Sequence, residues 1–113
     1  MSFFEIKYLI VDSFYSEKLK NNYSYRQSAG ICYEDFSEHI NNASWEGITV
    51  ISTIMSLKIR HKIELTKDDL NDIKYILELS RKIKLEMFLT EIEMEYLEED
   101  LQLLAFKLNE IEK

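Results

Sequence analysis

The sequence predicts an all-α fold, a single-domain bundle of four or five helices with a long C-terminal helical hairpin. The chain has 113 residues, no proline and only two glycines, whereas a β domain of this size needs many tight turns. Residues 48–113 contain neither glycine nor proline, as expected of helix interiors. Hydrophobic residues make up 46% of the chain, which is enough for one core over residues 1–113.

The first half of the chain is expected to hold two helices separated by a polar connection. Residues 3–20 place apolar side chains at three- and four-residue steps, which favours a helix, although alternation over residues 4–10 also fits a strand. Residues 21–31 are rich in Asn, Ser and Gly and are predicted to be the connection. Residues 33–41 are predicted to form a short helix, with Phe36 and Ile40 four residues apart.

Residues 45–60 are predicted to form a central, buried helix. Ser44 is a suitable N-cap. The apolar residues that follow spread over most of the helix circumference, and a helix that is apolar nearly all round lies inside a bundle. The only polar interruptions in its middle are small: Thr49, Ser52, Thr53 and Ser56. The β-branched content of residues 48–53 also permits a strand there.

The last third of the chain contains two helix starts and one continuous heptad pattern. Thr66 with Asp69, and Thr90 with Glu93, have the spacing of capping boxes. Apolar residues nevertheless keep one heptad register from residue 73 to residue 111. One interpretation is two helices that break near Thr90 and pack as a hairpin. The alternative is one helix of about 45 residues in a coiled-coil dimer. We favour the break, because so long a helix is rare in a small globular domain.

The segment TEIEMEYLEED, residues 90–100, holds six acidic residues and no basic one. On a helix, Glu91, Glu95, Glu98 and Glu99 fall within about 100° of one another. Two apolar stripes, one through Met94 and Leu97 and one with Ile92, Tyr96 and Leu103, are expected to be structural. Like charges at helical spacing repel by a few tenths of a kcal/mol, so the glutamate face is a candidate partner-binding surface. The alternative is an ordinary solvated face that lysines from another helix neutralise.

Three tyrosines around the polar connection form a second candidate surface: Tyr23, Tyr25 and Tyr33. Tyrosine is enriched at protein interfaces, which favours partner binding. The alternative is that these rings cap one end of the bundle.

The sequence lacks the residue patterns of a catalytic or metal centre. The one cysteine, Cys32, has no second thiol to pair with, and it is expected to be an inert thiol in a reducing compartment. Neither His39 nor His61 follows a glutamate three residues earlier, as a di-iron bundle requires. We therefore expect no catalytic residues, no metal, no cofactor and no enzymatic activity. Basic residues between 58 and 67 are expected to pair with acids elsewhere in the fold.

The net charge of −7 argues against direct nucleic-acid binding and favours a basic protein partner. The sequence thus predicts a small acidic helical protein, most naturally an inhibitor such as an immunity protein or antitoxin that blocks a basic toxin or nuclease. The alternative is a scaffolding protein that forms a homodimer along the seam of residues 73–111. The longest uncharged runs are far shorter than the roughly 20 residues of a membrane span, so we expect no membrane contact and a cytoplasmic location.

Overall fold

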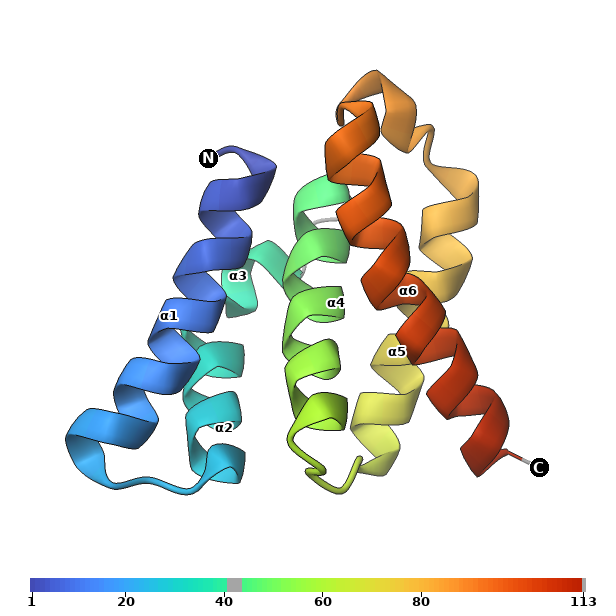
Figure 1. Ribbon diagram of the computed structural model, residues 1–113. Helices are drawn as coiled ribbons and strands as arrows, with labels where there is room; N and C mark the ends of the chain where they lie inside the picture. The colour runs from blue at the N-terminus through green and yellow to red at the C-terminus, as the bar shows by residue number, and fades with distance from the viewer. Residues whose placement is uncertain (41–43, 113) are drawn as a thin grey trace.

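The computed structural model describes residues 1–40 and 44–112 and confirms the all-α bundle (Figure 1). No strand occurs within these ranges, and none of their helices is long and apolar enough to cross a membrane. The elements of this part of the chain are α1 (Phe3–Asn21), α2 (Tyr25–Asp35), α3 (Ser37–Ile40), α4 (Trp45–Arg60), α5 (Lys67–Lys82), the 3₁₀ turn η1 (Leu85–Met87) and α6 (Glu91–Ile111).

Helix α4 is the centre of the bundle, as its sequence predicted. It packs against all five other α-helices of the described chain and lies between α1 and α2 on one side and α5 and α6 on the other (Figure 1). Every residue from Gly47 to Leu57 is buried. A strand over residues 48–53 is therefore excluded, because these residues lie inside a continuous helix.

The small hydroxyl side chains of α4 are buried without losing their hydrogen bonds. Thr49 donates to the carbonyl oxygen of Trp45 at 2.7 Å, and Thr53 donates to that of Thr49 at 2.7 Å. Ser52 also donates to the Thr49 carbonyl, at 3.2 Å. A buried hydroxyl without a partner would destabilise the fold, so these bonds inside the helix allow α4 to be buried on all sides.

The core forms two clusters on opposite sides of α4. Towards α1 and α2 it contains Ile6, Ile10, Phe14, Ala29, Cys32, Val50, Ile54 and Leu57. Towards α5 and α6 it contains Phe3, Ile48, Ile51, Met55, Ile73, Ile76, Leu85, Leu89, Leu97 and Leu104.

The C-terminal third is a helical hairpin, as predicted, and the alternative of one long helix is excluded. Helix α5 ends at Lys82 and α6 begins at Glu91, after residues 83–90 have reversed the chain direction (Figure 1). Both predicted capping boxes are present, at Thr66 and at Thr90. Several residues of the heptad seam are buried against α4 inside the chain, whereas Met87 in the turn is 72% exposed.

The first half of the chain contains one helix that the sequence did not predict. Residues 25–35 form α2, so the predicted connection at 21–31 shrinks to residues 22–24. Ser24 caps α2 in a capping box with Gln27. The fully buried residues of α2 are Ser28, Ala29 and Cys32, and these small side chains give a weak apolar pattern.

The remaining predictions for the first half are confirmed with small changes. Helix α1 ends at Asn21, one residue later than predicted, and residues 4–10 form no strand. Ser44 precedes α4 in extended backbone but makes no side-chain capping bond. Of the short helix expected at 33–41, residues 33–35 belong to α2 and residues 37–40 form α3, and residue 41 lies outside the described residues.

Substitution Ile54→Ala tests the central position of α4. Ile54 is 1% exposed, so the change leaves a cavity in the core, and we expect the free energy of unfolding to fall by about 2–5 kcal/mol. The matched control is Ile92→Ala, at a position 61% exposed on α6, which should change stability by less than about 1 kcal/mol. Urea denaturation measures both, and equal losses would contradict the central placement of α4.

Candidate functional site

Helix α6 directs the four glutamates of the candidate binding surface away from the bundle. Thr90 accepts a hydrogen bond from the backbone N–H of Glu93, and the Glu93 carboxylate accepts one from the backbone N–H of Thr90 at 2.8 Å. Leu97 and Leu104 are buried against the core and fix the rotation of the helix. The opposite side therefore faces solvent, and all four glutamates on it are exposed: Glu91, Glu95, Glu98 and Glu99.

These four glutamates, which we call the acidic face, have little neutralising charge near them. Among the described residues, the one ion pair of the acidic face joins Glu99 to Arg60, with Oε1 and Nη2 3.9 Å apart. Both side chains are more than half exposed, and such pairs contribute little to stability. The face is therefore a patch of largely uncompensated negative charge.

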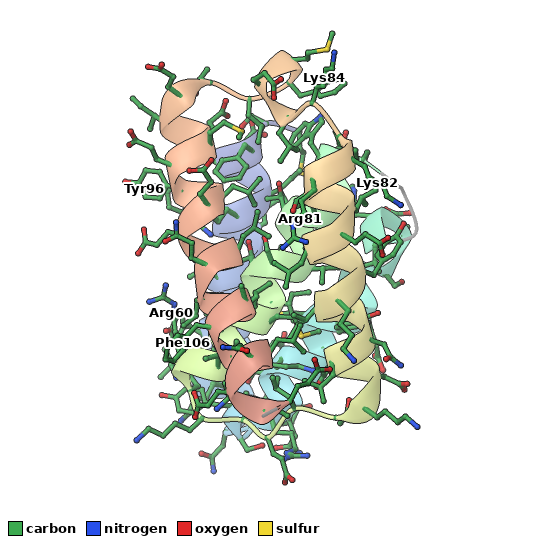
Figure 2. All side chains as sticks on the ribbon, turned by 90° about the vertical axis from the view of Figure 1, so that its right-hand side faces the viewer. Arg60, Arg81, Lys82, Lys84, Tyr96 and Phe106 are labelled. Carbon is green, nitrogen blue, oxygen red and sulfur yellow. The ribbon has the colours of Figure 1, made fainter. Side chains whose placement is uncertain are left out.

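Exposed apolar side chains border the acidic face, contrary to the expectation for the second apolar stripe of α6. Ile92 is 61% exposed and Tyr96 is 48% exposed, so neither lies in the core. Phe106, which the sequence analysis did not select, is 68% exposed. Figure 2 shows Tyr96, Arg60 and Phe106 along one edge of α6. Phe106 follows Ile92 and Glu99 at heptad spacing, and that spacing is the signal that would have identified it.

The tyrosines lie elsewhere and take part in packing. The ring of Tyr25 stacks on Phe14, with centroids 5.6 Å apart, and lies 4.3 Å from the ring of His61. The hydroxyl of Tyr33 donates to Asp72 on α5. Burial, followed by this contact with Asp72, raises the pKa of Tyr33.

Tyr23 is half-buried in the connection between α1 and α2. The three tyrosines are therefore not part of the acidic face, and the two groups of predicted site residues lie on separate elements. Tyr25 packs beside His61, the residue that follows α4, which fits the alternative that these rings close one end of the bundle, whereas Tyr33 links α2 to α5.

A buried ionic network, which the sequence analysis did not predict, links α1, α4 and α6. Asp100 is 5% exposed and accepts hydrogen bonds from Lys7 and from Ser56, the latter at 2.9 Å. Arg60 donates from Nε to the Ser56 hydroxyl oxygen at 3.0 Å. In the acid-rich segment 90–100, Asp100 thus stabilises the fold through buried contacts, whereas the four exposed glutamates do not.

Two of the basic residues between 58 and 67, Lys58 and Arg60, are paired with acids, in line with the sequence expectation for this segment. Lys58 donates to Asp69 at 2.8 Å, and both side chains are largely buried. Arg60 lies 3.8 Å from Asp100. These contacts tie the end of α4 to α5 and α6.

Two of the residues that sequence reasoning considered for catalysis or metal binding, Cys32 and His61, are held in structural contacts. The thiol of Cys32 is buried and donates to the carbonyl oxygen of Ile10 at 3.5 Å, and burial raises its pKa, so the reactive thiolate is disfavoured. His61 packs among the rings of Phe14, Tyr15 and Tyr25. Over the described ranges, no group of three or more His, Cys, Asp or Glu residues is arranged to hold a metal ion.

Comparison of the chain with protein-family models, with curated proteins and with solved structures found no match. The geometry of the chain itself is therefore the basis for its functional assignment.

Substitution Asp100→Ala tests the buried network. It leaves the ammonium group of Lys7 and the Ser56 hydroxyl without their partner, and we expect a loss of about 3 kcal/mol in the free energy of unfolding. This value is at the low end for a buried pair because the Lys7 side chain is 19% exposed. Glu98→Ala, two residues away but exposed, is the control and should change stability little. Similar denaturation midpoints for the two variants would refute a structural role for Asp100.

His61 makes stability depend on pH. Burial lowers the pKa of His61 below its ordinary value of 6.5, so the folded protein holds the neutral imidazole, whose Nε2 lies 2.8 Å from the Tyr15 hydroxyl oxygen. The unfolded chain binds the proton more readily, so this contribution to stability is present above pH 6.5 and is lost as pH falls through the lowered pKa. In His61→Phe the ring packing remains and the titration is absent. Denaturation of both proteins between pH 8 and pH 5 should show a steeper loss for the wild type, and parallel curves would contradict the assignment.

Proposed function

We propose that this protein binds a basic protein through the acidic face of α6 and acts as an inhibitor, such as an immunity protein or antitoxin that neutralises a toxin or nuclease. The observation that supports this proposal is the exposure of all four glutamates on one side of α6, where the described part of the chain gives them a single weak ion pair. Like charges at this spacing destabilise an isolated helix, and a cationic partner would remove that repulsion.

The chemistry of the face fits a phosphate-binding partner. A nuclease binds its substrate through lysine and arginine side chains that contact phosphates. A row of carboxylates offers the same cations a competing set of acceptors, so binding would block the nucleic-acid site. The net charge of −7 would also accelerate encounter with a basic protein and would disfavour direct nucleic-acid binding.

The apolar residues beside the acidic face could contribute binding energy that exposed charges do not provide. Aromatic side chains near the centre of an interface often contribute most of the binding energy, whereas charges at its rim mainly set the association rate. Tyr96 and Phe106 are exposed next to the glutamates and are suited to this anchoring role. We further propose a non-enzymatic function in the cytoplasm, where an unpaired thiol such as that of Cys32 is common.

Self-association along the seam of residues 73–111 is the weaker alternative. Ile73, Ile76, Leu97 and Leu104 from this seam are at most 1% exposed, because they pack inside their own chain. The burial of these four residues argues against a homodimer along this seam.

Charge reversal on the acidic face tests the proposal. The partner is first identified by co-purification and then measured, as a purified protein, by titration calorimetry at low and high salt. We expect affinity to fall with salt, and the double substitution Glu95→Lys with Glu98→Lys to weaken binding by about a hundredfold, which is roughly 2.7 kcal/mol. Coexpression with the wild-type protein should also restore growth to cells that make a toxic partner.

The matched control is Glu34→Lys with Glu64→Lys, which makes the same change in net charge at exposed positions outside α6. It should retain most of the affinity. Equal weakening by both pairs would mean that only the total charge matters, and unchanged affinity in the α6 variant would exclude the acidic face as the binding surface.

A further inference from the structure

Helix α1 has apolar side chains on two opposite faces, and only one of them is covered. The inner face, with Phe3, Ile6, Ile10 and Phe14, is buried in the core. On the outer face, the exposed fractions are 69% for Tyr8, 46% for Leu9, 39% for Tyr15 and 82% for Leu19. A helix at the edge of a bundle usually has a polar outer face, so the packing of this chain alone does not account for this surface.

The outer face of α1 contains a shallow open groove of about 670 Å³, which we call the α1 groove. Its lining is mainly apolar and comes from one helix: Glu5, Tyr8, Leu9, Val11, Asp12 and Tyr15. Ten residues of helix span about 15 Å, which is enough to contact two to three turns of a second helix.

The α1 groove continues into a cleft between α1 and α6. Val11 and Tyr15 line both, and the cleft, of about 260 Å³, has Thr53 and Leu57 of α4 at its floor. Figure 1 shows that α1 and α6 diverge from the end where the N-terminus lies, with α4 visible between them.

The narrow end of this cleft is closed by contacts between α1 and α6. The rings of Phe4 and Tyr96 meet edge to face with centroids 5.4 Å apart, and Lys7 is paired with Asp100. Tyr96 and Glu99 form the wall on the α6 side. The surface is therefore continuous from the α1 groove to the edge of the acidic face.

The charges on this surface identify the kind of partner. Glu5 and Asp12 are exposed in the α1 groove, and Glu99 lies at the opposite wall of the cleft. The cations at the cleft, Lys7 and Arg60, are both within ion-pair distance of Asp100. Lys18 and Lys20 lie in the last turn of α1, beyond the residues that line the groove, and Lys18 lies over the ring of Tyr25. A second copy of this chain would bring a further net charge of −7 and set carboxylates against carboxylates, so a cationic partner is complementary and a copy is not.

We propose that the α1 groove binds a basic amphipathic helix of the partner, with the helix's apolar residues on Tyr8, Leu9 and Tyr15 and its lysines or arginines facing Glu5 and Asp12. This is the helix-in-groove mode of recognition, with apolar anchors at three- and four-residue spacing. The inference rests on the proposed function, because it extends the same partner from the acidic face across the cleft to α1.

A model peptide tests the α1 groove without knowledge of the partner. The probe is a labelled synthetic peptide of leucines and lysines, with the leucines on one helical face, and its binding to the full chain is followed by fluorescence anisotropy. A peptide of the same composition in scrambled order is the control for charge alone. We expect the amphipathic peptide to bind and the scrambled peptide to bind about tenfold more weakly or not at all.

Two double variants locate the binding. Tyr8→Ser with Leu9→Ser removes exposed groove residues and should weaken peptide binding by about tenfold or more. The matched control, Tyr75→Ser with Ile111→Ser, removes residues that are 46% and 43% exposed on α5 and α6, and it should leave binding unchanged. Circular dichroism melting verifies that each variant is folded.

Several results would overturn the inference. These are failure of the peptide to bind, equal binding of both peptides, and equal effects of the two double variants. Self-association of the wild type that Tyr8→Ser with Leu9→Ser abolishes would show that a second copy occupies the groove instead. Loss of partner binding on charge reversal at Glu95 and Glu98, with no effect at Tyr8 and Leu9, would overturn the α1 groove and leave the acidic face intact. Loss of partner binding on substitution of Tyr8 and Leu9, with no effect of charge reversal at Glu95 and Glu98, would overturn the role of the acidic face alone.

Discussion

The burial of α4 on all sides is the constraint on which the rest of the structure depends. A helix with eleven consecutive buried residues must be surrounded, and the other helices of the described chain each cover part of it. This burial is permitted because the hydroxyl groups of α4 bond to carbonyl oxygens of the same helix or, at Ser56, to Asp100. Mixed small and large side chains also let the neighbouring helices pack closely on both sides.

The same constraint determines which surfaces remain for binding. Once α5 and α6 have covered α4 with their seam residues, the glutamates of α6 have no position except the solvent side. The hydrogen bonds of Asp100 hold α6 against α1 and α4 near Lys7 and Ser56. The cleft between α1 and α6 opens beside these contacts. The acidic face, the cleft and the α1 groove are thus three consecutive parts of one surface, formed by two helices that converge at one end.

The sequence was informative where each residue type had one plausible environment. Continuous apolar character identified α4, and the spacing of Thr90 with Glu93 located the start of α6, because capping depends on only four neighbouring residues. It was uninformative where the same pattern fits two environments. The heptad register over residues 73–111 fits a long coiled coil or a hairpin, and only the covering helix decides between them. Helix α2 was missed because its fully buried residues, Ser28, Ala29 and Cys32, are small and because a segment rich in Asn, Ser and Gly also fits a connection.

By itself, the sequence determined the helical class, the central helix and the shared direction of the four glutamates on α6. All of these follow from local periodicity and capping, which depend on residues near one another in the chain. The tertiary structure alone decided that Asp100 is buried while Glu98 and Glu99 are exposed, that Tyr25 and Tyr33 serve packing, and that the outer face of α1 is uncovered. These outcomes depend on which helix lies against which. Lys7 and Asp100 are separated by 93 residues, and no local pattern predicts that they meet.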